Sequence, residues 1–258
     1  MYKVVSGLLE VCSAIFQGYC LHYFYGNFLE GRIRNRRING MAATVLYGIL
    51  RLGLGIFLPN DYGSFWVFAR LAMILGIISV IALVFYRAGG KMRFFLTAVF
   101  MAVSEISAFL AYTFGELGNL LIVLWGWCVE KGYIVSAGVL SALVHITVIG
   151  TNVLVFIVSA VVIYYLLKEV MNTFREKSYR IGNTELLFLM TPSLIAILIC
   201  SLLRAILFTM EDGAPKQIYD RYPSLAIIVP VILILSLLSI VFGVKLFQDM
   251  IYRNREKS

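Results

Sequence analysis

Residues 65–86 read FWVFARLAMILGIISVIALVFY, an apolar run whose only charged residue is Arg70. A helix needs about 20 predominantly apolar residues to cross the hydrocarbon core of a bilayer. The rest of the chain repeats this pattern, because 61% of its 258 residues are hydrophobic and only 14% are charged. A soluble protein with so few charges would expose large apolar patches to water. The composition therefore predicts a multi-pass membrane protein.

The alternation of apolar runs and polar breaks predicts an all-α fold, a transmembrane bundle of about seven helices. The expected helices lie near residues 4–26, 41–58, 65–86, 94–114, a fifth ending near 167, 185–209 and 224–249. The path of residues 115–150 is the least determined. Residues 117–130 (LGNLLIVLWGWCVE) are expected at the outer interface or partly re-entrant, because Trp125 and Trp127 suit the headgroup zone.

Lysine and arginine are distributed unevenly between the polar breaks. The segments 28–40, 87–93, 168–184 and the stretch from 245 onward together hold fifteen of them, against four in the alternate breaks. Cytoplasmic loops carry an excess of basic residues. This predicts an N-terminus outside, a C-terminus in the cytoplasm and an odd number of crossings. Topology also explains the net charge of +8, so no nucleic-acid partner is expected.

Several ionisable or polar side chains fall inside the predicted helices, and the four charged ones among them all lie in the outer half. Helical offsets of three, four and seven place polar or small residues on the same faces, and such faces should contact other helices rather than lipid. A histidine is included because it is the one side chain there that titrates near neutral pH. The predicted polar network consists of Glu10, Gln17, Arg51, Glu105, His145 and Arg204.

Two interpretations of this network remain open. It is either an ion-pair network that fixes helix packing, or the floor of an outward-facing cavity whose arginines receive a carboxylate or carbonyl of a ligand. In the second case the loop 210–223 lies above the cavity. The predicted ligand contacts are Arg51, Glu105, Arg204, Asp220 and Arg221.

The sequence carries none of the common catalytic signatures. HExxH, GxSxG, GxxxxGK[ST] and GxGxxG are absent, and its two histidines both fall in predicted helices. The four cysteines show neither CxxC pairing nor metal-ligand spacing, which favours buried apolar roles. We therefore expect no enzymatic activity, no metal and no cofactor.

The predicted last helix stays amphipathic as it leaves the membrane, keeping Val244, Phe247 and Ile251 at offsets of three and four. Three strings, ELLFLMTPSL (185–194), YDRYP (219–223) and KLFQDMI (245–251), resemble the membrane sensor region of bacterial GHKL-type sensor histidine kinases. That group includes the accessory-gene-regulator-like peptide receptors. The similarity is clearest over residues 185–258.

The resemblance implies a homodimeric receptor in the bacterial cytoplasmic membrane, sensing an extracellular peptide or small ligand, or the membrane lipid. Its partner would be a cytoplasmic kinase domain or response regulator. On this interpretation residues 1–249 form the transmembrane sensor bundle and 250–258 begin a cytoplasmic signalling helix. The signal would pass by motion of the last two predicted helices to the cytoplasmic output. The chain departs from the family by lacking the phosphoacceptor histidine and the ATP-binding domain.

Two other functions compete with the receptor interpretation. A transporter or permease subunit would favour polar groups near the midplane and repeated, broken helices, whereas the charges here lie in the outer half and no repeat is visible. An intramembrane enzyme would need a clustered nucleophile, base or metal set, which the sequence does not offer.

Overall fold

The structure, a computed structural model, describes residues 2–58, 64–133, 136–175, 190–191, 193–201, 208–211 and 214–217. It is almost wholly helical, which confirms the predicted helical fold class. The long helices are α1 (Tyr2–Phe28), α2 (Arg36–Phe57), α3 (Ser64–Phe85), α4 (Gly90–Glu130) and α5 (Ala137–Arg175). A further helical stretch covers residues 193–201. The predicted helix 224–249 lies outside the described residues.

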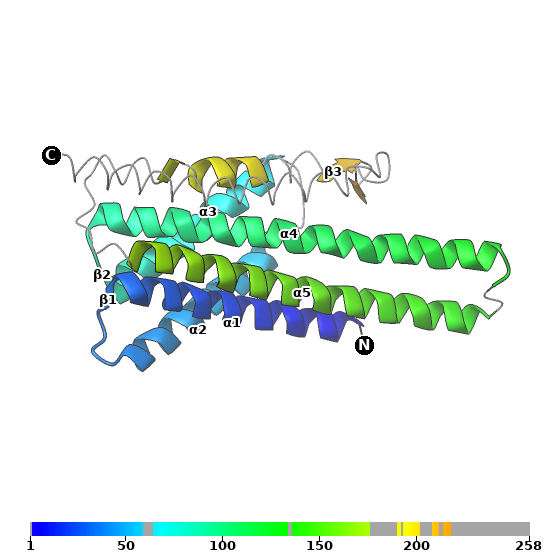
Figure 1. Cartoon of the computed structure of the whole chain (residues 1–258), viewed down its shortest axis with the longest axis horizontal. Helices are drawn as coiled ribbons and strands as arrows, with labels where there is room; N and C mark the ends of the chain where they lie inside the picture. The colour runs from blue at the N-terminus through cyan, green and yellow to red at the C-terminus, as the bar shows by residue number, and fades with distance from the viewer. Residues whose placement is uncertain are drawn as a thin grey trace.

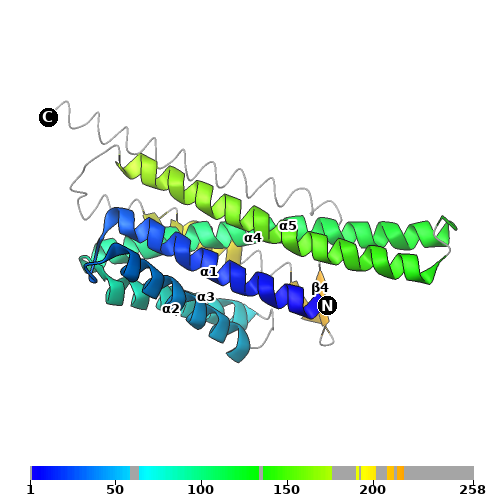
Figure 2. The same ribbon diagram turned by 90° about the horizontal axis from the view of Figure 1, so that it is seen from below.

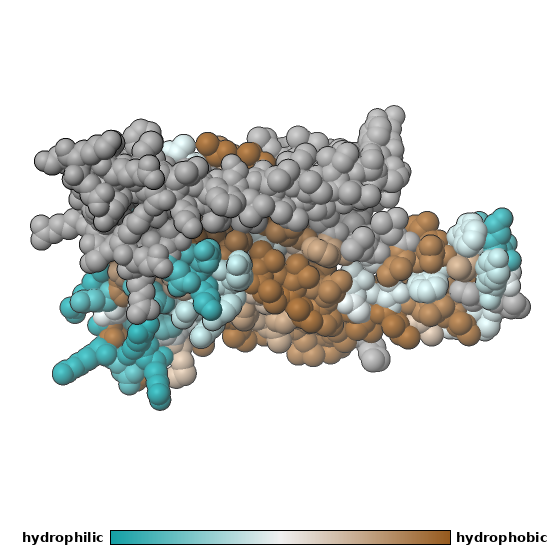
Figure 3. Space-filling model, in the orientation of Figure 1, coloured by the Kyte–Doolittle hydropathy of each residue, from teal (hydrophilic) through white to brown (hydrophobic). Residues whose placement is uncertain are grey.

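Five helices among the described residues are long and apolar enough to cross a membrane, as a multi-pass membrane protein requires. Figure 1 shows them running roughly along one axis, with α1, α3 and α5 returning to the same end of the molecule. We call this the basic end, because the polar segments 29–35 and 86–93 meet there. Figure 3 shows hydrophilic residues gathered at that end, followed by a broad hydrophobic surface.

Two of the helices begin earlier than the sequence predicts. α2 starts at Arg36 rather than near 41, and α4 at Gly90 rather than near 94. Arginine and lysine are good helix formers, so their charge does not end a helix. The side chain of Asn35 also caps α2 by accepting a hydrogen bond from the backbone N–H of Arg37 at 3.1 Å.

The alternative in which residues 117–130 are partly re-entrant is wrong, because they continue α4 as one helix to Glu130. Their placement at the outer interface stays a prediction. Two glycines of this continuous helix serve packing against α5. A Cβ at Gly118 would collide with the side chain of Thr151 on α5, and one at Gly115 would lie 3.4 Å from Val155. α5 likewise runs on to Arg175 rather than ending near 167. Together α4 and α5 form a long helical hairpin that extends past the N-terminus of α1 (Figures 1 and 2).

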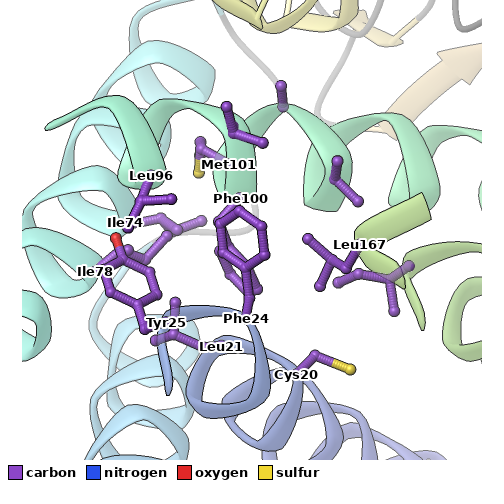
Figure 4. Packing of buried hydrophobic residues seen from close by; sticks show 14 of the residues in the cluster. Cys20, Leu21, Phe24, Tyr25, Ile74, Ile78, Leu96, Phe100, Met101 and Leu167 are labelled. Atoms are coloured by element: carbon purple, nitrogen blue, oxygen red, sulfur yellow. The ribbon is translucent and has the colours of Figure 1, made fainter. Parts of the chain in front are cut away.

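The hydrophobic core lies nearer the basic end. Phe24 and Leu21 of α1 meet Phe100 of α4, Ile78 of α3 and Leu167 of α5, all of them almost completely buried (Figure 4). Lipid is as apolar as these side chains, so inside a membrane the contacts stabilise the bundle through close packing rather than through removal from water.

The described residues contain two small antiparallel sheets, the first between distant segments of the chain and the second between adjacent ones. β1 (Glu30–Gly31) pairs with β2 (Tyr86–Arg87) at the basic end, tying the α1–α2 connection to the α3–α4 connection. β3 (Phe208–Glu211) pairs with β4 (Ala214–Gln217). The loop 210–223 was expected to be only a compact polar connection, so this hairpin is an addition to the prediction.

α1 and α2 cross with their backbones in close contact. A Cβ at Gly18 would lie 2.9 Å from the carbonyl oxygen of Thr44 and 3.1 Å from its Cα, and one at Gly40 would collide with the imidazole of His22. Small residues allow this close approach, which is the usual way in which helices associate in membranes. The crossing fixes which α1 side chains face α2.

We expect Gly18→Ala to lower the free energy of unfolding by about 1–3 kcal/mol, because the backbone of Thr44 cannot move aside as a flexible side chain would. Gly53→Ala is the matched control on α2, since a Cβ there meets nothing within 4 Å. It should be neutral, or stabilising by up to about 1 kcal/mol through helix propensity. The measurement is unfolding of the purified protein in mixed micelles. Equal stability of the two variants would contradict the close crossing.

Candidate functional site

Tyr47 occupies the centre of a polar cluster between α1, α2 and α4. It is 1% exposed, and its hydroxyl donates a hydrogen bond to Oε1 of Gln17 at 3.1 Å. The Gly18–Thr44 contact places these two side chains opposite each other, one residue from Gly18 on α1 and three from Thr44 on α2. A buried phenol needs such a partner, because an unpaired hydroxyl in an apolar environment is costly.

Arg51 and Glu105 add opposite charges to this cluster. Arg51 follows Tyr47 by one helical turn, Glu105 comes from α4, and the charges of both act on the Tyr47 hydroxyl. Glu105 is only 6% exposed, and Arg51 is half-buried. At 1.5 Å per residue both lie about 22 Å along their helices from the basic end. The fold therefore brings these two predicted residues to one level, around one tyrosine.

The cluster offers a guanidinium, a carboxylate and a hydroxyl, and the carboxylate and hydroxyl belong to almost completely buried side chains. A charge at the centre of a bilayer costs about 2.5–3.5 kcal/mol on insertion scales, so opposite charges at one level stabilise each other there. Arginine also presents several N–H donors in a planar fork that suits carboxylates and carbonyls. Chemically the arrangement suits binding and charge compensation.

Two predicted members of the network lie outside the buried cluster. Glu10 is exposed, two helical turns from Gln17 toward the N-terminus. His145 is also exposed, and its Nδ1 lies 2.7 Å from the carbonyl oxygen of Ser141 within the same helix. Ser159, which contacts α4 next to Glu105, lies 14 residues away from His145, or about 21 Å along α5. His145 therefore belongs to the projecting part of the hairpin.

The remaining predicted site residues, Arg204, Asp220 and Arg221, lie outside the described residues and stay predictions. The predicted helix 185–209 can be followed over 193–201, where Ser193, Cys200 and Ser201 are buried, as expected of a face that contacts other helices.

A second polar cluster, at the basic end, was missed by the sequence analysis. Nδ1 of His22 lies 2.7 Å from the Tyr86 hydroxyl, and the Tyr25 hydroxyl lies 2.7 Å from Oγ1 of Thr97. Burial raises the pKa of the Tyr86 phenol far above its ordinary value, against the opposing effect of Arg36, so the phenol stays neutral. The sequence showed only histidine and tyrosines near a helix end, a pattern that is also typical of interfacial residues.

Neither protein-family models, nor curated proteins, nor solved structures match this chain. The function is therefore argued from the residues alone.

We expect Tyr47→Phe and Gln17→Leu to show energetic coupling in a double-mutant cycle, because each removes the same hydrogen bond. Such bonds between helices in membranes contribute about 0.6 kcal/mol on average, with a maximum of about 1.7 kcal/mol. The free energy of unfolding in mixed micelles gives the coupling energy. Tyr19→Phe is the control, since Tyr19 is half exposed on the same helix as Gln17 and should not couple to it. Additive effects of Tyr47→Phe and Gln17→Leu would contradict the bond.

Proposed function

We propose that the chain is the membrane sensor module of a GHKL-type signal-transducing histidine kinase, in which the Tyr47 cluster responds to a ligand and α2 and α4 relay the response to the basic end. The observation that carries the proposal is the placement of Arg51 and Glu105 at one level around the buried Tyr47. The kinase domain and the homodimer belong to the same proposal, and rest on the three family-like strings in the sequence.

The proposed orientation places the basic end in the cytoplasm. Four arginines of the first break and three basic residues of the second meet at this end through the β1–β2 pairing. Basic residues are retained on the cytoplasmic side of membrane proteins. With this orientation Arg51 and Glu105 lie about 22 Å from the cytoplasmic ends of their helices, in the outer half of a hydrocarbon core about 30 Å thick.

The relay is supported by the way the basic end is tied together. α2 and α4 carry the charged residues, and both begin at the basic end, directly after the segments joined by β1 and β2. A ligand that binds Arg51 removes part of its attraction for Glu105 and so changes the relative stability of two α2–α4 arrangements. Any displacement of these helices reaches the β1–β2 sheet without passing through a long loop.

The cluster chemistry favours a ligand that carries a carboxylate or carbonyl group. Arg51 can donate hydrogen bonds to such a group. The negative charge of Glu105 repels any anion that cannot take the place of Glu105 beside Arg51. A peptide or small acid arriving from the outer side would have this chemistry. Arg204, Asp220 and Arg221 belong to the same proposed ligand site.

We expect Glu105→Gln, in the chain fused to a GHKL-type kinase domain, to change basal autophosphorylation about fivefold or more, because it removes the buried negative charge at the level of Arg51. Glu10→Gln is the matched control, since it removes an exposed carboxylate from α1. Autophosphorylation is measured on membranes that contain equal amounts of inserted protein. Unchanged activity for both variants would end the sensor proposal, and substrate uptake by proteoliposomes of the chain would favour the transporter instead.

The orientation has its own test. In a variant with all four native cysteines replaced, we expect Lys131→Cys, at the tip of the α4–α5 hairpin, to react with a membrane-impermeant maleimide in intact cells. Arg34→Cys, at the basic end, should react only after permeabilisation, because the bilayer keeps the reagent from the cytoplasm. Both positions are exposed, so access to solvent is matched. The opposite labelling pattern would reverse the proposed topology.

A further inference from the structure

Five exposed cations gather on one surface of the basic end, around the β1–β2 sheet. They come from two segments more than fifty residues apart in the chain, which β1 and β2 hold side by side. Figure 3 shows the hydrophilic residues of this end projecting as a group. We call this surface the cationic platform, and its members are Arg32, Arg34, Arg37, Arg87 and Lys91.

The backbone beneath the platform is fixed by hydrogen bonds. The N–H of Arg32 donates to the carbonyl of Phe85 at 2.8 Å, and Glu30 stands opposite Arg87 in the sheet. The side chain of Asn39, which is buried, accepts from the N–H of Ile33 at 3.4 Å. The cations therefore extend from an ordered support, which lowers the entropy lost when they bind a common partner.

Two further arginines have structural roles and are not counted in the platform. Arg36 donates to the carbonyl of Gly26 at 3.3 Å. Arg93 donates through Nε and Nη2 to the carbonyl of Ala88, at 3.0 and 2.7 Å. Arg36 thus links α2 to the end of α1, and Arg93 holds the turn before α4. The platform cations, by contrast, face away from the protein, with Glu30 as the one acid on the two strands.

Large apolar side chains are exposed within the first of these segments and in the first turns of α2 and α4 that follow. Ile33 is 39% exposed, Ile38 51%, Met41 64% and Phe94 47%. We call these four side chains the apolar rim. They would not contribute to the binding of nucleic acid or an acidic protein in water. At the boundary between headgroups and acyl chains, however, apolar side chains contact the chains while arginines and lysines reach the headgroups.

The two helices that begin beside the platform strengthen its attraction for anions. The N-termini of α2 and α4 carry the positive ends of their helix dipoles. The N-cap of α4 is Gly89, which has no side chain to satisfy the first N–H groups of the helix. Phosphate groups bind readily at such positions, and here Arg87 and Lys91 flank the helix start.

We propose that the cationic platform binds the phosphate headgroup of an anionic lipid in the leaflet that faces the basic end. One headgroup bridges the Arg32–Arg37 segment and the Arg87–Lys91 segment, and its acyl chains lie against the apolar rim. The lipid thereby reinforces the β1–β2 pairing, which ties the four helix ends together. The inference goes beyond the proposed function and does not rest on it, since it needs only the platform and a bilayer.

The test measures lipid binding by the full-length chain in a non-ionic detergent. A phosphatidylglycerol with a fluorescent acyl chain is first bound to the protein. Its fluorescence anisotropy is then followed as an unlabelled competitor lipid is added. We expect unlabelled phosphatidylglycerol to displace it at concentrations about tenfold lower than phosphatidylcholine does, because each platform cation contributes to the attraction. Equal competition by the two lipids would overturn the proposal.

Variants separate the platform from general charge. The triple variant Arg32→Gln, Arg34→Gln and Arg37→Gln should weaken phosphatidylglycerol binding about tenfold or more. The charge-matched control Arg253→Gln, Arg255→Gln and Lys257→Gln removes three cations from the C-terminal stretch and should bind as the parent does. An equal loss in the control would overturn the proposal in favour of unspecific attraction.

Two further arms identify the partner and guard against misfolding. If glycerol phosphate displaces the probe as efficiently as phosphatidylglycerol does, the ligand is a free phosphate and not a lipid. If polyglutamate displaces the probe more efficiently, the partner is an acidic protein. The triple variant Arg32→Lys, Arg34→Lys and Arg37→Lys keeps the charge and should retain most of the binding. If it binds as weakly as the glutamine variant, the loss reflects a damaged sheet and the proposal fails.

Discussion

The backbone contact between Gly18 of α1 and Thr44 of α2 is the constraint on which the polar interior depends. Inside a membrane, helices gain little from burying apolar surface against one another, so close packing and hydrogen bonds decide their pairing. With no Cβ at Gly18 the two backbones approach closely. Only at this separation does the Tyr47 hydroxyl reach Gln17 at 3.1 Å. The absence of a side chain at Gly18 therefore sets the orientation of Tyr47. It also sets the position of Arg51, one turn later on α2.

Much of the helical fold follows from the sequence, because a bilayer demands apolar runs of a set length. α1 and α3 were predicted to within two residues at each end. The failure at 117–130 has a definite cause. Trp125 and Trp127 favour an interface, a signal that does not distinguish a continuing helix from a re-entrant segment, and glycine weakens a helix in isolation. In the fold, Gly118 faces Thr151 of α5, and the contact between the helices outweighs the local cost. The sequence could not predict the β1–β2 sheet, because strands of two residues have no hydrophobic periodicity.

The candidate site was accessible to sequence reasoning only in part. Charges within apolar runs are conspicuous, and counting residues along each helix placed Arg51 and Glu105 in the same half of the bundle. Tyr47 lies one turn before Arg51 on the same face of α2, yet its pairing with Gln17 depends on how α1 and α2 cross, which no single-helix pattern contains. His145 was included because it titrates near neutral pH, and the sequence alone did not show that it lies in an exposed part of α5.

The length of the α4–α5 hairpin has a consequence for how its two ends communicate. The apolar stretch Gly138–Asn172 is about 52 Å long, against about 30 Å of hydrocarbon, and even a tilt of 40° shortens its span only to about 40 Å. The hairpin extends beyond the level at which α1 begins, as Figure 2 shows. The two helices also contact each other in the projecting part, where Nε1 of Trp125 donates a hydrogen bond to Oγ1 of Thr147 at 3.0 Å. Glu105 lies on the same uninterrupted helix as Trp125. A displacement of the tip is then transmitted along α4 to the polar cluster without crossing a loop, which a break near residue 115 would have prevented.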